Sequence, residues 1–252
     1  MNIDYISNLE HADKLCESFR TRIMYIFFKG DSATTSIISN YCETKTYQMY
    51  FRPVKRCVEL CRVLKPKSIA ANEDYLYERI PDFEDSTKVI NKRDFDIKFN
   101  FLKATLAMVS QEMLSFFSSF DADERERINE AIHAYFENCT YSCIAMSVSA
   151  VESRLLKLMS LTRPDTIPKL EDMTLGQLIT EYIQNKEAYK NVVPKKHKAL
   201  LELCNTYRIF SVHPMKEDIS AGIASSILNL SLAFLADKNT VPETAKSKIP
   251  TA

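Results

Sequence analysis

The chain has 252 residues, enough for one large domain or two small ones, and its 33 Lys and Arg residues balance its 33 Asp and Glu residues. With no net charge, the protein lacks the global field that would draw it to nucleic acid or to a membrane surface. Its three glycines argue against a turn-rich β fold, and because none lies in GxGxxG or GxxxxGK, they also argue against dinucleotide-binding and P-loop chemistry.

The first half of the chain is predicted to be helical, with one irregular stretch. Residues 4–28 carry apolar side chains at a helical period and are predicted to form one helix. Residues 34–65 are predicted as two helices, because Pro53 lacks the amide that a helix interior needs. Residues 66–93 are predicted as a long loop, with a small strand as the alternative, and helical periodicity returns over 95–120.

The second half begins with a helix start after Phe120. Asp121 or Ser119 can cap that helix, and the acids of its first turn favour the positive end of the helix dipole. Two stretches without charged residues, 138–151 and 219–236, are predicted as helices at the centre of a bundle. The second is long enough to span a membrane, but its serines and its missing basic flank favour a buried helix.

The remaining elements complete the expected organisation. Residues 162–172 are predicted as a loop, 174–182 as a short helix, and Pro194 as the first residue of a further helix. The fold class is therefore all-α. Residues 1–120 are expected to form an N-terminal helical region, and residues 121–238 an up-and-down helical bundle packed with it. Residues 239–252 are expected to be a polar, disordered tail.

Seven cysteines, an odd number, are typical of reduced thiols in the cytoplasm. The pairs Cys57/Cys61 and Cys139/Cys143 each share one helix face. A metal site can use this spacing, but no CxxC or HxxxH accompanies the pairs, so they are predicted to be buried small hydrophobes. The N-terminus lacks the apolar core of a signal peptide, which also favours a cytoplasmic protein.

The stretch of residues 200–224 is the one around which the chain is organised. An apolar helical run delivers Arg208 and His213 near its end, and Pro214 follows at once. Arginine offers a permanent cation in a planar fork suited to phosphate, and histidine titrates near neutrality. The alternative is structural: an arginine that complements the last helix carbonyls and a histidine that packs.

Three segments in order resemble the HEPN family (higher eukaryote and prokaryote nucleotide-binding domain). The first is the apolar helix 141–159 with Glu152 inside it, the second is the short helix 174–183, and the third is Arg208 followed by four residues and His213. The resemblance covers residues 121–238. It implies a helical bundle and a metal-independent endoribonuclease whose composite site lies between two protomers, with no cofactor and no metal.

The resemblance also assigns roles to residues. His213 would act as general base on the ribose 2′-hydroxyl or as acid on the leaving oxygen, and Arg208 would stabilise the phosphorane charge. Asn205 and Ser211 lie three residues before and after Arg208, so they are candidate phosphate or base contacts, with local caps as the alternative. Independently of the resemblance, the apolar run around Glu152 suggests that it is buried and paired with Arg208, with an exposed helix carboxylate as the alternative.

A lysine-rich segment precedes the motif helix and offers local attraction for phosphate, although a solvated charged face is the alternative. The candidate RNA-binding residues in it are Lys190, Lys195, Lys196 and Lys198. The implied partners are a second copy of the chain, an RNA substrate and an antitoxin or regulatory protein, in a toxin-like or antiviral defence role.

Ile209 stands where many active members of the HEPN family have a polar residue. This departure keeps open a second class of function, a catalytically inactive dimerisation or binding module on the same bundle. A purely structural helical protein is the third class, which explains the bundle but leaves the Arg208/His213 motif without a role.

Overall fold

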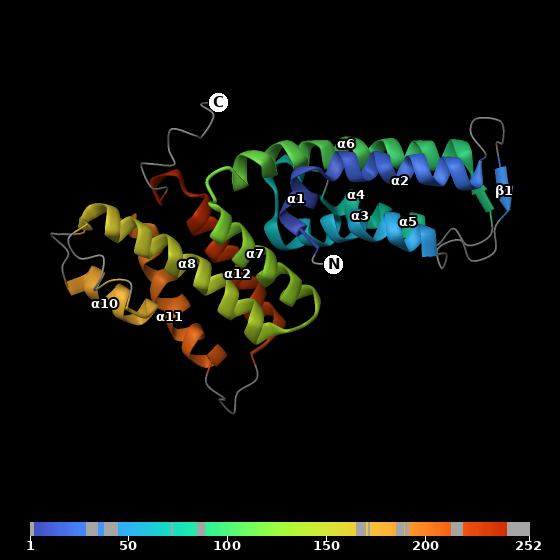
Figure 1. Cartoon of the computed structure of the whole chain (residues 1–252). Helices are drawn as coiled ribbons and strands as arrows, with labels where there is room; N and C mark the ends of the chain where they lie inside the picture. Colours follow the sequence, from blue (N-terminus) through green and yellow to red (C-terminus); the bar gives the residue numbers. More distant parts are fainter. Residues whose placement is uncertain are drawn as a thin grey trace. The chain divides into compact units, whose positions relative to one another are not determined.

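The structure, a computed structural model, is all-α (Figure 1). It divides into two compact units, an N-terminal unit of Asp4–Ser115 and a C-terminal unit of Phe116–Ala252 together with Met1–Ile3. The sequence predicts the boundary after residue 120, and the structure has it after Ser115. The structure describes residues 3–28, 35–37, 45–71, 73–84, 89–164, 170, 172–184, 189, 192–212 and 219–240.

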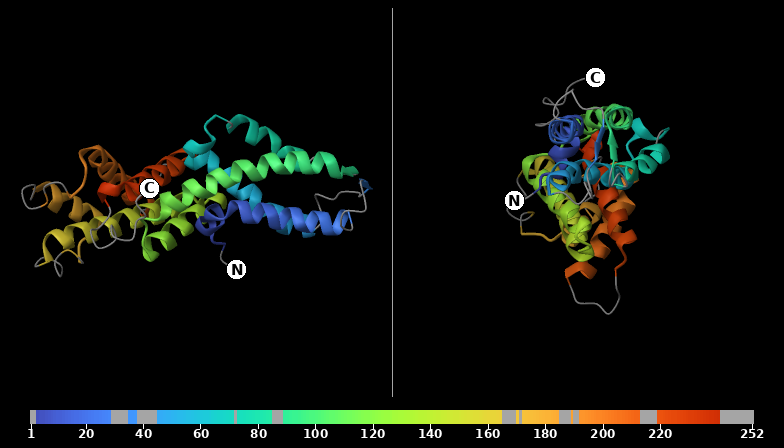
Figure 2. Two further views of the ribbon diagram at one scale, coloured as in Figure 1. Left: turned by 90° about the horizontal axis from the view of Figure 1, so that it is seen from above. Right: turned by 90° about the vertical axis from the view of Figure 1, so that its right-hand side faces the viewer.

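The N-terminal unit consists of helices and one short two-stranded ribbon. Its elements are α1 (Tyr5–Glu10), α2 (Ala12–Phe27), β1 (Thr35–Ile37), α3 (Lys45–Leu64), η2 (Lys67–Ile69), α4 (Glu73–Arg79), α5 (Pro81–Glu84), β2 (Val89–Asn91) and α6 (Lys92–Phe117). The strands pair antiparallel, with Ser36 opposite Ile90. Helices α2 and α6 run alongside each other (Figure 2), and the Nζ of Lys103 lies 2.6 Å from the Oε2 of Glu17.

Phenylalanines form the centre of the N-terminal unit. Phe19 of α2 lies with its ring centroid 5.1 Å from that of Phe51 of α3 and 5.9 Å from those of Phe83 and Phe95. These four side chains are buried. Such clusters combine large apolar area with favourable edge-to-face geometry, so one cluster fixes α2, α3, α5 and α6 together.

Several sequence predictions for the N-terminal unit need correction. The helix expected over residues 4–28 is two helices, divided at His11, whose φ of −128° leaves the helical region. Conversely, Pro53 lies inside the single helix α3. A proline in a helix interior costs about 3 kcal/mol, but Phe51 and Val54 on either side of it are buried, and we attribute the continuity of α3 to this burial against α2.

Two further stretches differ from their predictions. Strand β1 lies where helix was expected, and residues 66–93, predicted as a loop, contain η2, α4, α5 and β2 in their described part. Cys57 and Cys61 are buried, as predicted, and burial raises the pKa of the Cys61 thiol to about 12. The second pair is divided, because Cys143 is buried and Cys139 is exposed.

The C-terminal unit is a bundle built around one helix. Its elements are α7 (Ala122–Phe136), α8 (Thr140–Thr162), α10 (Leu175–Gln184), η4 (Lys195–His197), α11 (Lys198–Val212), α12 (Ala221–Ala236) and η5 (Lys238–Thr240). Helix α8 packs against α7, α10, α11 and α12, and Figure 1 shows it between them. The prediction that the uncharged stretches form buried helices is confirmed for α8 and α12.

The start of α7 follows its sequence signal closely. Asp121 accepts a hydrogen bond from the amide of Glu124, and Glu124 accepts one from the amide of Asp121, which completes a capping box. Ser119, the other predicted cap, instead donates to the carbonyl of Leu235. Among the described residues, no helix is long and apolar enough to cross a membrane.

The predicted tail of residues 239–252 begins inside the bundle. Thr240 is buried in η5, and its hydroxyl donates to the carbonyl of Phe234 over 2.5 Å. Its polar composition misled the prediction, because a threonine hydroxyl is readily buried once it donates to a backbone carbonyl. Residues 241–252 lie outside the described part of the chain.

Candidate functional site

The helix that carries the Arg208 motif is an integral part of the C-terminal bundle. Pro194 is the N-cap residue of η4, which leads directly into α11. Helix α11 packs against α8, α10 and α12, and its buried stripe includes Leu201 and Cys204. Arg208 follows Cys204 by four residues, so its backbone lies about one helical turn farther along α11.

The described structure covers the predicted catalytic pair only in part. Arg208 and Ser211 have a helical backbone in α11, but their side chains are outside the described set. His213 and Lys190 lie outside the described residues altogether. The pairing of Arg208 with His213, and of Arg208 with Glu152, therefore stays a prediction.

Asn205, the predicted neighbour of Arg208, is held against α10. A Cβ placed on Gly176 would lie only 2.8 Å from the Oδ1 atom of Asn205. The Asn205 side chain can therefore occupy this position only because residue 176 has no Cβ atom. The Oδ1 atom is buried and has no hydrogen-bond partner among the described residues, so it remains a polar atom that a ligand or water can satisfy.

Glu152 was predicted to be buried, and the structure corrects this expectation. It is half-buried on α8 and lines a pocket of about 430 Å³. The other residues that line the pocket are Arg127, Ser149, Ser153, Leu156, Asp172, Met173, Thr174 and Leu178. Glu152 is only half-buried because its side of α8 does not face the bundle centre. The other residues on that side are half-buried as well: Ser149, Ser153 and Leu156.

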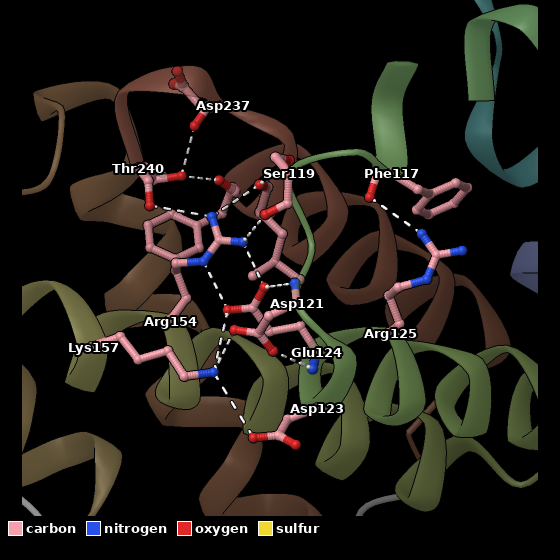
Figure 3. A network of polar contacts seen from close by, with 12 residues as sticks. Phe117, Ser119, Asp121, Asp123, Glu124, Arg125, Arg154, Lys157, Asp237 and Thr240 are labelled. Atoms are coloured by element: carbon pink, nitrogen blue, oxygen red, sulfur yellow. Dashed lines mark hydrogen bonds and ion pairs between the residues drawn. The ribbon is translucent and has the colours of Figure 1, made fainter. Parts of the chain in front are cut away.

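Glu124 is a fully buried carboxylate of this unit, and its partner is Arg154 of α8 (Figure 3). The Nε atom of Arg154 donates to Oε1 of Glu124 over 2.7 Å, and its Nη2 donates to Oε2 over 2.5 Å. Both side chains are at most 1% exposed. Such a bidentate pair is tolerated in the interior only because every donor finds an acceptor.

The remaining donors of Arg154 bind backbone carbonyls at three places in the unit. Nη2 donates to the carbonyl of Ser119 over 2.8 Å, and Nη1 donates to those of Leu235 and Thr240, each over 3.1 Å. All five N–H groups of the guanidinium are therefore satisfied. One side chain of α8 thus ties together the start of α7, the end of α12 and η5, as Figure 3 shows.

Sequence reasoning missed this pair, although both signals were available. Glu124 is the third helical residue after the cap Asp121, the position of the acid in a capping box. Arg154 is a cation inside the same apolar run from which Glu152 was selected. Arg154 could not be singled out because sequence spacing does not show which side of α8 faces the bundle centre.

The described lysines among the predicted RNA-binding residues differ in their partners. Lys195 and Lys198 are exposed. Lys196 is 65% exposed, yet its Nζ lies 2.5 Å from Oδ2 of Asp237. The same oxygen lies 2.8 Å from Nε2 of His197, a buried residue. This cluster fixes η4 to the end of α12, so Lys196 has a structural partner that competes with phosphate.

The Asp237 cluster predicts a pH dependence of stability. Burial opposes ionisation of Asp237, but hydrogen bonds from Lys196, the Asn239 amide and His197 outweigh it and hold its pKa well below the usual range. A lowered folded-state pKa contributes stability that is present above the unfolded pKa, about 3.9, and is lost as the pH falls below it. Wild type should therefore exceed Asp237→Asn in unfolding free energy at neutral pH.

This difference should shrink as the pH falls from about 4 towards 2. Urea unfolding of both proteins at several pH values measures it, and comparison with the variant removes the contribution of the other carboxylates. A difference that is constant, or that grows in acid, would contradict the assignment.

Comparison of the chain with protein-family models, with curated proteins and with solved structures finds no match.

Proposed function

We propose that the C-terminal unit is a metal-independent endoribonuclease of HEPN type that acts as a homodimer. The observation that supports it best is the position of Arg208 in the last turns of α11, a helix packed directly against the central α8. An arginine in that position has a rigid support, which a residue that stabilises a transition state requires.

The chemistry follows from two side chains. His213 takes the proton of the ribose 2′-hydroxyl, whose oxygen attacks the neighbouring phosphorus, and the bond from phosphorus to the 5′-oxygen breaks. Arg208 stabilises the extra negative charge on the phosphorane oxygens. The leaving 5′-oxygen receives a proton, so the products are a 2′,3′-cyclic phosphate and a 5′-hydroxyl end.

A homodimer supplies the second proton-transfer group. The base and the acid act on opposite sides of phosphorus, and each chain offers one motif histidine. A two-fold axis that brings two α11 ends to one cleft provides both groups without any further residue. Lys195 of η4 and Lys198, the first residue of α11, are exposed and would attract the RNA backbone, an attraction that should weaken with salt.

The cellular setting is part of the same proposal. Reduced thiols in the described chain agree with a cytoplasmic protein, in which an active ribonuclease needs control. We therefore expect an antitoxin or another regulatory protein as partner, in a toxin-like or defence role.

The test is incubation of the purified protein with mixed RNA in EDTA, followed by analysis of the product ends. Cleavage that leaves cyclic phosphate and 5′-hydroxyl ends is expected, and it should weaken as salt increases. Folded wild-type protein, verified by circular dichroism, that leaves every RNA intact with and without added divalent ions would overturn the proposal.

One observation favours the second candidate, a binding module without catalysis. Ile209 is 43% exposed on α11 next to Arg208. An uncovered apolar side chain beside the motif is suited to a protein contact. Under this alternative the Ile209→Lys variant would lose self-association in analytical ultracentrifugation, while no RNA would be cleaved by either protein.

A further inference from the structure

The pocket beside Glu152 contains two charged residues, Arg127 and Asp172, that have no role in the proposed ribonuclease chemistry. Its floor is one side of α8, where Ser149, Glu152, Ser153 and Leu156 recur at helical spacing. Arg127 of α7 lines it, and so do residues 172–174 and Leu178 of α10. All of these belong to the C-terminal unit. Its volume, about 430 Å³, is in the range of small-molecule sites.

Arg127 provides the strongest indication of a ligand. Its Nη1 donates to the hydroxyl of Ser149, and within the described part of the chain this neutral hydroxyl is its partner, with no carboxylate paired to it. A half-buried guanidinium that is held in place by a neutral hydroxyl can pair with an anion that enters the pocket. Its planar fork matches a carboxylate in particular.

The rest of the lining limits the kind of anion. Asp172 is exposed and comes from the segment before α10, and Glu152 is a second carboxylate in the lining, so negative charge belongs to the same pocket as Arg127. Apolar contact is available from Leu156, Met173 and Leu178, and Thr174 adds a hydroxyl. A ligand that satisfies this set carries a carboxylate, a positively charged amine and a modest apolar group.

We propose that this pocket binds a free α-amino acid with an apolar side chain. The carboxylate of the ligand pairs with Arg127 and its ammonium group with Asp172, while Glu152 and the hydroxyls accept or donate further hydrogen bonds. The apolar side chain rests on Leu156, Met173 and Leu178. The two charged contacts come from Arg127 and Asp172, and neither residue has a role in the proposed ribonuclease chemistry.

Isothermal titration calorimetry with L-leucine and L-methionine tests the proposal on the full chain. Two half-ligands separate the contacts: 4-methylpentanoate retains the carboxylate, and 3-methylbutylamine retains the amine. Each half-ligand should bind at least about 10-fold more weakly than L-leucine, since each forfeits one charged contact. Arg127→Gln should reduce the affinity for L-leucine and for 4-methylpentanoate but leave the affinity for 3-methylbutylamine unchanged.

Asp172→Asn should show the opposite pattern and weaken the amine and the amino acid but spare the pentanoate. Glu126→Gln, at an exposed carboxylate of α7 that does not line the pocket, is the matched control and should bind like wild type. Thermal unfolding of each variant verifies the fold, and the half-ligand that a variant still binds shows that its pocket is intact.

Three outcomes would overturn the proposal. The first is that neither amino acid binds at millimolar concentration. The second is amino acid binding that is insensitive to Arg127→Gln and Asp172→Asn. The third is binding of inorganic phosphate, dependent on Arg127, in the absence of amino acid binding, which would identify a phosphate site instead.

Discussion

Replacement of Arg208 by alanine should lower the rate of RNA cleavage by about 10²–10³-fold, because the arginine stabilises charge that develops only in the transition state. Replacement of His213 by alanine should lower it by about 10²–10⁴-fold through the loss of proton transfer. Single-turnover cleavage of an end-labelled RNA measures both effects. Neither change should unfold the bundle, since the buried residues described in α11, Leu200, Leu201 and Cys204, precede both positions.

Matched controls separate the motif from general charge effects. His133→Ala removes an exposed histidine of α7, and Lys238→Ala removes an exposed cation of η5. Both should cleave RNA at nearly the wild-type rate. If Arg208→Ala and His213→Ala cleave as fast as these controls, the ribonuclease activity does not reside in the motif.

The variant Arg154→Met should lower the unfolding free energy of the C-terminal unit by about 3–5 kcal/mol. Methionine retains much of the volume but removes both hydrogen bonds that the fully buried Glu124 carboxylate accepts from Arg154, and leaves it only the Nζ of Lys157, 4.0 Å from Oε1. It also leaves the carbonyls of Ser119, Leu235 and Thr240 without the donor they have in wild type. Urea denaturation followed by circular dichroism measures the loss.

Two further variants give this prediction its controls. Lys157→Met removes a cation that contacts Asp121 from a partly exposed position, and exposed ion pairs contribute only about 0–1 kcal/mol. The double variant Glu124→Gln/Arg154→Met should be less destabilised than the sum of its single variants, because they share one interaction. A loss below about 1 kcal/mol for Arg154→Met would contradict the role of the pair.

Hydrogen exchange locates the effect within the molecule. Because Arg154 ties the end of α12 and η5 to α8, amides near Leu235 and Thr240 should exchange faster in Arg154→Met than in Lys157→Met. Exchange in the N-terminal unit, from α1 to α5, should stay unchanged in both variants.

The sequence by itself determined the features that depend on local spacing. Helical periodicity and scarce glycine predicted the all-α class, which the structure confirms, and the acids after Phe120 predicted the capped start of α7. The uncharged stretches predicted that α8 and α12 are buried. These inferences succeed because helix period and capping are encoded within a few neighbouring residues.

Only the tertiary structure decided which polar residues meet. Glu152 and Arg154 are two residues apart in one helix, yet Glu152 lies on the pocket side of α8 while Arg154 points to the bundle centre and meets Glu124, 30 residues earlier in the chain. In the same way, α3 continues through Pro53, whose neighbours are buried. Thr240, predicted to lie in a disordered tail, is buried and accepts a hydrogen bond from Arg154. Such choices depend on long-range burial and hydrogen-bond satisfaction, whose free energies outweigh local propensity and are not contained in the spacing of residues along the chain.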